Sequence, residues 1–154
     1  MGQRKLEQVQ IDLFRDEGFL ALPTIFDVAA TQEVQQLLDP LLQDFHKLPE
    51  GELRGEVNRA LRMEPRLTHS TVYRTCQAFA KQLIGRHAAY SFDHAIYKLP
   101  YSDHETPWHQ DQAYMGHPVS FNTVHFWVPL QDVTERNGCM QFALHAYETV
   151  SAAH

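Results

Sequence analysis

The sequence predicts an α+β domain with a mainly β core, in which helices of the first half pack on a sheet formed by the second half. Two observations support this class. Apolar residues recur with helical spacing before about residue 90 and with a period of two after it. The chain also lacks the alternation of strands and helices that is typical of a parallel doubly wound sheet. With 154 residues, of which 44% are hydrophobic, we expect one domain over residues 1–154, with 1–90 as mostly helical support and 91–154 as strands.

Two helices are predicted before residue 46. The first ends at Gly18, and a short strand over residues 19–23 follows it. The second has Asp27 or Thr31 as its N-cap residue and contains Pro40, which should kink it or end its regular part. The apolar stripes of these helices consist of Leu6, Val9, Leu13 and Phe14, and of Val34, Leu37, Leu38, Leu41, Leu42 and Phe45.

A loop and a third helix complete the first half. Residues 46–68 combine Pro and Gly with scattered charges and little apolar pattern, which indicates a loop. The third helix is predicted over residues 71–84, where the apolar residues again follow a helical period. Gly85 is well placed to end it.

The second half is expected to supply the strands of the core. Strands are predicted over residues 92–99, 119–130 and 139–144, which are rich in aromatic and aliphatic side chains. Asn137 and Gly138 form a turn signal between the last two strands. Helices first and strands afterwards are the order that favours the α+β class.

Charge and composition exclude several classes of partner. The net charge is −6 and no run of Lys and Arg occurs, so no nucleic acid partner is expected. No stretch approaches the roughly 20 apolar residues that span a bilayer, so no membrane association is expected either. The N-terminus has no apolar signal segment. We therefore expect a cytoplasmic protein in which Cys76 and Cys139 are buried, reduced thiols.

Histidine is the residue type that points to chemistry. Ten histidines are present, and five of them lie within residues 94–125. In an extended strand His109 and Asp111 project from the same face, which puts an imidazole beside a carboxylate. This pair supplies two of the three ligands of a 2-His-1-carboxylate iron site. The triplet is short, so it can also arise without a metal site. In that alternative, His109 and Asp111 only hydrogen-bond to each other.

The segments around this triplet resemble the phytanoyl-coenzyme A dioxygenase family of Fe(II)- and 2-oxoglutarate-dependent oxygenases. The order and spacing of the similar blocks cover most of the chain. These blocks are residues 14–20 (FRDEGFL), 96–100 (IYKLP), 106–111 (TPWHQD), 119–121 (VSF), 126–134 (FWVPLQDVT) and 137–142 (NGCMQF).

The resemblance implies a partial double-stranded β-helix of the jelly-roll or cupin kind, with the N-terminal helices packed on its sheet. It implies Fe(II) as cofactor, 2-oxoglutarate as co-substrate, and hydroxylation of a small organic molecule coupled to decarboxylation of 2-oxoglutarate to succinate. By motif position, His109 and Asp111 carry over as metal ligands. Lys98 and Trp127 carry over as residues that approach 2-oxoglutarate. For Trp127 the alternative is core packing, and for Lys98 it is a solvated strand end.

The chain departs from the family pattern after its Asn-Gly turn. The family continues with Pro-Gly-Ser-His, a distal histidine ligand and an arginine that clamps 2-oxoglutarate, whereas residues 142–148 here read FALHAYE and no arginine follows Arg136. The residues after Asp111 suffice for about three or four strands, where a closed double-stranded helix has about eight. We therefore expect a C-terminally truncated or degenerate domain. No third iron ligand is assigned, because a packed or hydrogen-bonded imidazole is the expectation for His125.

Two other functions compete with the oxygenase. A catalytically inactive fragment or degenerate member could act as a binding or assembly module. It would self-associate through exposed strand edges, hold iron loosely and not turn over 2-oxoglutarate. A zinc hydrolase built on His109 and Asp111 has less support, because no H-E-x-x-H or comparable second histidine cluster occurs. The sequence does not select a substrate.

Overall fold

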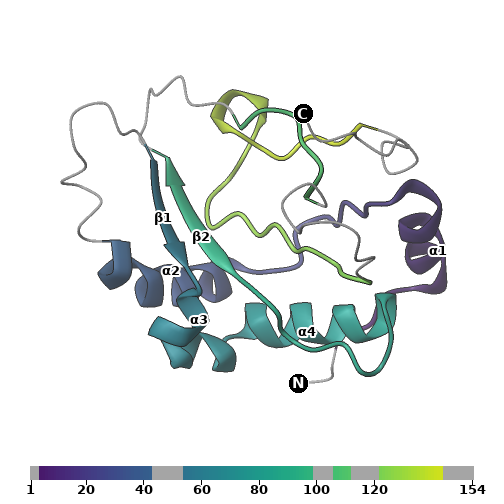
Figure 1. Ribbon diagram of the computed structural model, residues 1–154, viewed down its shortest axis with the longest axis horizontal. Coiled ribbons are helices and arrows are strands. Elements are labelled where there is room, and N and C mark those ends of the chain that lie inside the picture. The colour runs from purple at the N-terminus through teal and green to yellow at the C-terminus, as the bar shows by residue number, and fades with distance from the viewer. Residues whose placement is uncertain (1–3, 43–53, 99–105, 112–121, 144–154) are drawn as a thin grey trace.

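Figure 1 shows the computed structural model, in which helices at the bottom of the view support a two-stranded sheet. The structure describes residues 4–42, 54–98, 106–111 and 122–143. Within these ranges the helices, strands and 3-10 helices (η) follow one another as α1 Gln8–Glu17, α2 Val28–Leu42, β1 Arg54–Asn58, α3 Ala60–Met63, η2 Pro65–His69, α4 Thr71–Leu83, β2 His94–Lys98 and η4 Glu135–Asn137. The described residues thus form a mixed helix and sheet structure.

Helix α1 ends where the sequence predicts. Gly18 adopts φ 80°, and its N–H donates to the carbonyl oxygen of Phe14 at 3.0 Å. A residue with a Cβ is strained at this φ, which is why glycine suits the helix C-terminus. The strand predicted over residues 19–23 is wrong, because these residues have no regular secondary structure. The described strands pair with each other instead of with this segment.

Helix α2 begins earlier than its apolar stripe suggests. Asp27 Oδ1 accepts the N–H of Ala30 at 2.9 Å, so Asp27 is the N-cap residue and Thr31 lies inside the helix. One face of this helix is buried against the rest of the domain. Its buried residues are Ala30, Val34 and Leu38.

Pro40 lies inside α2, and the helix continues beyond it to Leu42. A proline has no N–H, so the carbonyl of Gln36 loses its helical partner. Both Gln36 and Pro40 are exposed, so water can hydrogen-bond this carbonyl. Of the two effects predicted for Pro40, an end of the regular helix is therefore wrong, and a kink stays a prediction.

The sheet consists of β1 and β2, which pair antiparallel with Arg54 opposite Lys98. The loop predicted over residues 46–68 is wrong in its described part, which contains β1, α3 and the start of η2. The sequence of β1 is R-G-E-V-N, and Val57 is the apolar residue that it buries, at 4% exposure. Its strand conformation comes from pairing with β2, a non-local interaction that the local pattern does not reveal.

Asp93 holds the turn between β1 and α3. Arg59 adopts a left-handed φ of 59°, and its N–H donates to the carbonyl oxygen of Asp93 at 2.8 Å. The Asp93 carboxylate accepts the N–H of Leu61 at 3.3 Å and the hydroxyl of Tyr90. Burial, together with this hydrogen bond to Asp93, raises the pKa of Tyr90 to about 12. The carboxylate thus satisfies an N–H at the start of α3 that has no helical partner.

Helix α4 closes the bottom of the core. Ser70 is 1% exposed, and its Oγ accepts the N–H of Tyr73 at 3.1 Å and donates to the carbonyl oxygen of Leu67 at 2.7 Å. The predicted third helix is confirmed to within one residue, and Gly85 follows its C-terminus at φ 112°. The core cluster is built from α2, β1, α3, η2 and α4. Its members are Ala30, Val34, Leu38, Val57, Ala60, Leu67 and Val72.

The second half contains less sheet than predicted. Of the predicted strands, 92–99 is confirmed as β2, whereas the described parts of the other two, 122–130 and 139–143, have no strand. Residues 119–121 and 144 lie outside the described residues. Aromatic and aliphatic content favours a strand only where a neighbouring strand is available for pairing. The described residues therefore do not form a closed double-stranded β-helix, although the predicted turn at Gly138 (φ 89°) is confirmed.

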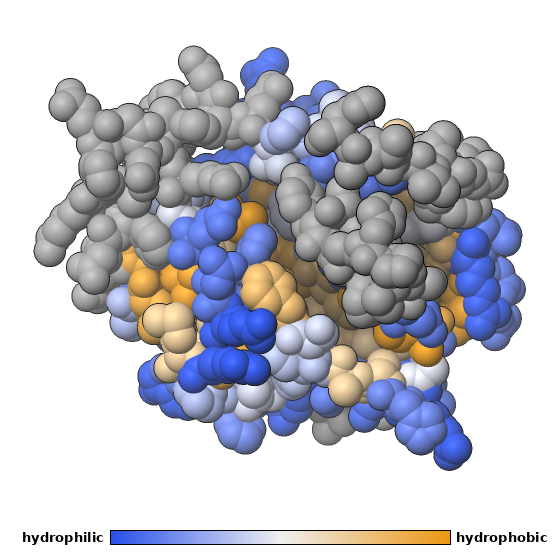
Figure 2. All heavy atoms as spheres, in the orientation of Figure 1, coloured by the Kyte–Doolittle hydropathy of each residue, from blue (hydrophilic) through white to orange (hydrophobic). Residues whose placement is uncertain are grey.

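Apolar side chains remain on the surface of the domain. Figure 2 shows some of them near the middle of one face, bordered by hydrophilic side chains. The rings of Phe19 and Phe142 stack with 4.6 Å between their centroids, which joins residues 139–143 to the segment after α1.

Among the described residues, no helix has both the length and the apolar character to cross a bilayer.

Candidate metal centre

The carboxylate of Asp111 lies between two imidazole rings. His109 Nε2 is 3.3 Å from Asp111 Oδ1, and His125 Nδ1 is 2.5 Å from Asp111 Oδ2. Each carboxylate oxygen therefore faces a different ring nitrogen. We call these three residues the His-Asp-His cluster. Its side chains are one third to one half exposed, so a small molecule or an ion can reach them from solvent.

His109 is oriented by the backbone of its own segment. Its Nδ1 lies 2.7 Å from the carbonyl oxygen of Pro107. Because a carbonyl oxygen can only accept, Nδ1 carries a proton, and in the neutral tautomer Nε2 is the nitrogen that has a lone pair. A backbone carbonyl that accepts the second ring N–H is the usual partner of a histidine that binds a metal through its other nitrogen.

The facing atoms of His109 and Asp111 fit a cation. In the neutral tautomer the lone pair of Nε2 points at a carboxylate oxygen that also carries lone pairs, so the two atoms repel unless a proton or a cation lies between them. An imidazole nitrogen and a carboxylate oxygen are both donors that Fe(II) accepts. Over the ranges that the structure describes, no three His, Cys, Asp or Glu side chains converge as a metal-binding group. His109 and Asp111 are therefore an incomplete ligand set within those ranges.

Lys98 connects the sheet to the segment that carries the H-x-D triplet. Its Nζ donates to Thr106 Oγ1 at 2.8 Å. Residues 106–111 have little regular secondary structure of their own, so this contact with the last residue of β2 helps to position them. Lys98 is exposed at the strand end, which agrees with the alternative of a solvated position, and its ammonium group lies beside the start of the triplet segment.

The segment that carries His125 is held at both ends. Asn122 Nδ2 donates to the carbonyl oxygen of Ile84, at the C-terminus of α4, at 3.3 Å. Val128 and Leu130 pack against the core cluster. His125 lies between these two attachments, so its position is fixed even though residues 122–130 form no strand.

The structure brings together three of the residues singled out from the sequence. His109 and Asp111 lie side by side, as the H-x-D spacing predicts, and their role as metal ligands stays a prediction. His125 contacts Asp111 and is half exposed, so the expectation of a packed imidazole is wrong and that of a polar contact is confirmed. Trp127 is 46% exposed, so it is not packed in the core. The approach of Lys98 and Trp127 to 2-oxoglutarate stays a prediction.

The partnership of His125 with Asp111 is the site feature that sequence reasoning missed. A period of two puts His125 on the same side of an extended segment as Trp127. That local signal identifies a shared side but not the residue that faces it. The contact joins two segments whose pairing depends on the tertiary fold, and no spacing rule predicts it.

The two cysteines do not form a nucleophilic site. Both are free and partly buried, so the prediction of full burial is wrong, and their reduced state stays a prediction. Burial raises the pKa of the Cys76 thiol to about 11. The reactive thiolate form is therefore scarce at neutral pH.

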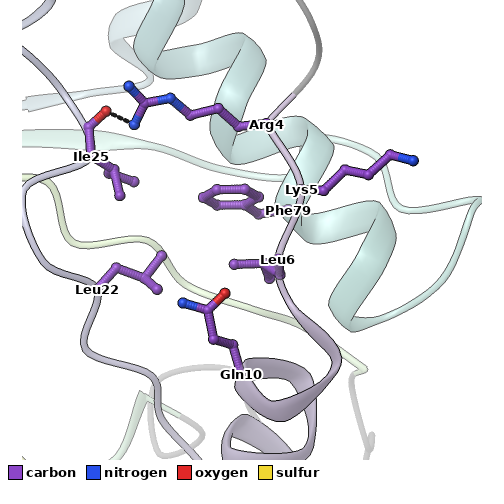
Figure 3. A pocket seen from close by; sticks show the side chains of 7 residues that line it. All are labelled: Arg4, Lys5, Leu6, Gln10, Leu22, Ile25 and Phe79. Atoms are coloured by element: carbon purple, nitrogen blue, oxygen red, sulfur yellow. Dashed lines mark hydrogen bonds between the residues drawn. The ribbon is translucent and has the colours of Figure 1, made fainter.

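A separate pocket of about 150 Å³ lies between the N-terminal segment, α1 and α4 (Figure 3). Apolar and polar side chains line it: Leu6, Leu22, Ile25 and Phe79, together with Arg4, Lys5 and Gln10. Arg4 donates a hydrogen bond to the carbonyl oxygen of Ile25 at its edge. None of these residues belongs to the His-Asp-His cluster, so this pocket is not the opening of the candidate metal centre.

Comparison with known families identifies the chain. The phytanoyl-CoA dioxygenase (PhyH) family model matches residues 14–143, which include the end of α1, the sheet and the His-Asp-His cluster. Comparisons with curated proteins and with solved structures give no match. The match covers most of the chain and confirms the resemblance seen in its sequence blocks. The chain belongs to the phytanoyl-CoA dioxygenase family.

Proposed function

We propose that this protein is an Fe(II)- and 2-oxoglutarate-dependent dioxygenase that hydroxylates a small organic molecule. Membership of the phytanoyl-CoA dioxygenase family supports this class of activity. The observation that carries the proposal is the 3.3 Å approach of His109 Nε2 to Asp111 Oδ1, with the opposite ring nitrogen held by the Pro107 carbonyl. In the neutral tautomer of His109, this arrangement places an imidazole nitrogen and a carboxylate oxygen side by side as two metal donors.

His109 and Asp111 would hold the metal in this proposal. The His109 imidazole is oriented towards Asp111 by its contact with Pro107. When bound, Fe(II) would supply the oxygen chemistry that couples decarboxylation of 2-oxoglutarate to hydroxylation of the substrate. The protein contributes the orientation of the two donors and an approach open enough for a co-substrate.

Lys98 and Trp127 are the residues that we propose for 2-oxoglutarate. The ammonium group of Lys98 lies beside Thr106, in the segment that carries the triplet, and a cation there attracts a dicarboxylate. Trp127 presents a half-exposed ring two residues after His125. An exposed tryptophan can cover the apolar methylene groups of the co-substrate.

We also propose that the described sheet belongs to the double-stranded β-helix of the family. The face of β1 that carries Val57 packs against α2, as expected for a helix that supports one sheet of such a fold. Large apolar side chains that remain exposed on or beside β2 would suit further strands. These are Phe92 and Ile96, at 52% and 48% exposure.

A binding or assembly module is the second candidate function. Two observations favour it. The same apolar side chains are exposed, and one edge of each strand in the described two-stranded sheet pairs with no other described strand. In that case a second copy of the chain would add to this sheet. Light scattering after size-exclusion chromatography, across a tenfold range of protein concentration, separates a monomer from a self-associating chain.

Succinate formation tests the proposed enzyme. The full chain is incubated with Fe(II), ascorbate, oxygen and 2-oxoglutarate, with and without candidate substrates. We expect succinate above the iron-free background, and a loss of at least about 100-fold in His109→Ala and in Asp111→Ala. His87→Ala and Asp39→Ala, which change exposed residues outside the cluster, are matched controls. No turnover by the unmodified chain, or equal turnover in all variants, would contradict the proposal.

A further inference from the structure

The carboxylate of Asp111 makes its shorter contact with His125, not with its sequence neighbour His109. The two nitrogen–oxygen distances are 2.5 Å and 3.3 Å, and they involve different carboxylate oxygens. Charge-assisted contacts between a ring N–H and a carboxylate lie near 2.8 Å, so the first distance is that of a close hydrogen bond. Asp111 is therefore engaged on one side before any cation binds on the other.

The chemistry of this contact determines which atom carries the proton. A lone pair on His125 Nδ1 at 2.5 Å from a carboxylate oxygen would be strongly repulsive, so Nδ1 is the protonated nitrogen. Its N–H then points at Asp111 Oδ2. The same nitrogen is no longer available as a metal ligand in this arrangement.

Engagement of Oδ2 fixes the other oxygen as well. A carboxylate group that is free in solvent rotates about its Cβ–Cγ bond, because this torsion has a broad energy profile. With Oδ2 held by His125, Oδ1 remains directed at His109 Nε2. The donor pair is thus oriented from both ends, by Pro107 through His109 and by His125 through Asp111.

We propose that His125 is the positioning residue of Asp111, and that its Nδ1–H presents Oδ1 to a divalent cation beside His109 Nε2. The proposal rests on the proposed function only in assigning the His109–Asp111 pair to a metal. His125 is suited to this task because its segment is attached on one side to α4, through Asn122, and on the other to the core. Hydrogen-bonded partners of ligating carboxylates typically change metal affinity by about 10- to 100-fold when removed.

Two substitutions of His125 distinguish the role of its Nδ1–H hydrogen-bond donor from that of the volume of the ring. His125→Asn keeps an N–H donor close to the position of Nδ1, whereas His125→Leu removes it and retains the apolar volume. The affinity of the full chain for Co(II), followed by visible absorption, is the readout. We expect a Co(II) Kd about 10- to 100-fold weaker in His125→Leu and within about threefold of the unmodified chain in His125→Asn. His87→Leu, at an exposed turn after α4, is the matched control and should not change the Kd.

A second readout does not depend on the metal. In the metal-free chain, nitrogen NMR of the histidine rings reports which nitrogen carries the proton, and we expect a protonated Nδ1 in His125. Thermal unfolding of each variant shows whether it is folded before it is titrated.

The outcomes distinguish this proposal from the proposed function. Equal weakening in His125→Asn and His125→Leu, or no weakening in either, overturns the positioning role. A protonated Nδ1 combined with Co(II) binding that is indifferent to His109→Ala and Asp111→Ala overturns the metal centre instead. Absence of Co(II) binding by the unmodified chain overturns both.

Discussion

His109 Nδ1 lies 2.7 Å from the carbonyl oxygen of Pro107, and this contact turns Nε2 of the same ring towards Asp111. The partner is a backbone atom two residues away, so the orientation is encoded within the short segment itself. The start of that segment is held to β2 by the hydrogen bond from Lys98 to Thr106. The His109 donor atom of the candidate metal centre is therefore positioned by local contacts on a segment that has little regular secondary structure.

Substitution of Lys98 should affect 2-oxoglutarate more than chemistry. If its ammonium group binds a carboxylate of 2-oxoglutarate, Lys98→Met should raise the KM for 2-oxoglutarate about tenfold, equivalent to about 1.4 kcal/mol, and leave kcat nearly unchanged. Steady-state succinate formation at varied 2-oxoglutarate measures both constants. Lys81→Met, which removes an exposed ammonium group from α4, is the control. Trp127→Leu should show the same pattern, and an unchanged KM in both variants would exclude these residues from the co-substrate site.

Removal of the Ser70 hydroxyl should destabilise the fold. Ser70 is 1% exposed, and its Oγ accepts the N–H of Tyr73 at the start of α4. Ser70→Ala leaves this N–H and the carbonyl of Leu67 without their side-chain partner, which should lower the free energy of unfolding by about 1–3 kcal/mol. Urea unfolding followed by circular dichroism measures the change. Thr71→Ala, which alters an exposed side chain one residue later, should cost less than about 0.5 kcal/mol; a similar cost for both would contradict the capping role.

The two cysteines should differ in reactivity. Burial raises the pKa of the Cys76 thiol to about 11, which leaves little thiolate at pH 8. In the folded chain Cys139 should therefore react with a disulfide reagent at least about tenfold faster than Cys76. Cys76→Ala and Cys139→Ala, measured separately, assign the two rates. Equal rates in the folded protein would show that the environment of Cys76 does not suppress its thiolate.

Cys76 also predicts a decrease of stability at alkaline pH. Its pKa in the folded chain, about 11, is above the ordinary value of 9.0, so the folded state binds the proton more tightly than the unfolded state. The resulting stabilisation is complete below pH 9 and is lost as the pH rises from 9 through 11. It amounts to about 2 kcal/mol. Urea unfolding at pH 8 and pH 11 should show a smaller decrease for Cys76→Ala than for the unmodified chain, and equal decreases would contradict this account.

The parts of the fold that the sequence predicts are those with local signals. Gly18 ends α1, and Gly85 follows the end of α4, because few residues other than glycine adopt their positive φ values. Strand β1 has no local signal, because its R-G-E-V-N sequence becomes a strand through pairing with β2. The opposite error concerns residues 122–130, whose aromatic and aliphatic pattern predicts a strand that no described neighbour pairs with.

In the candidate site too, local contacts can be predicted from the sequence and non-local contacts cannot. The proximity of His109 and Asp111 follows from their spacing of two residues, and the structure has it. The contact of His125 with Asp111 could not be predicted, because it depends on how Asn122, Val128 and Leu130 attach a distant segment to α4 and the core. Local spacing thus accounts for the donor pair, and tertiary packing accounts for the residue that orients it.

Formation of an Fe(II)–2-oxoglutarate chelate tests the central claim most directly. Under anaerobic conditions Fe(II) is added to the full chain and then 2-oxoglutarate, and the visible charge-transfer absorption of an iron–2-oxo acid chelate is recorded. We expect this absorption in the unmodified chain and in His87→Ala, and its loss in His109→Ala and Asp111→Ala, because both donors are needed to hold the metal. Absorption of equal strength in all four proteins, or none in the unmodified chain, would contradict a metal centre at His109 and Asp111.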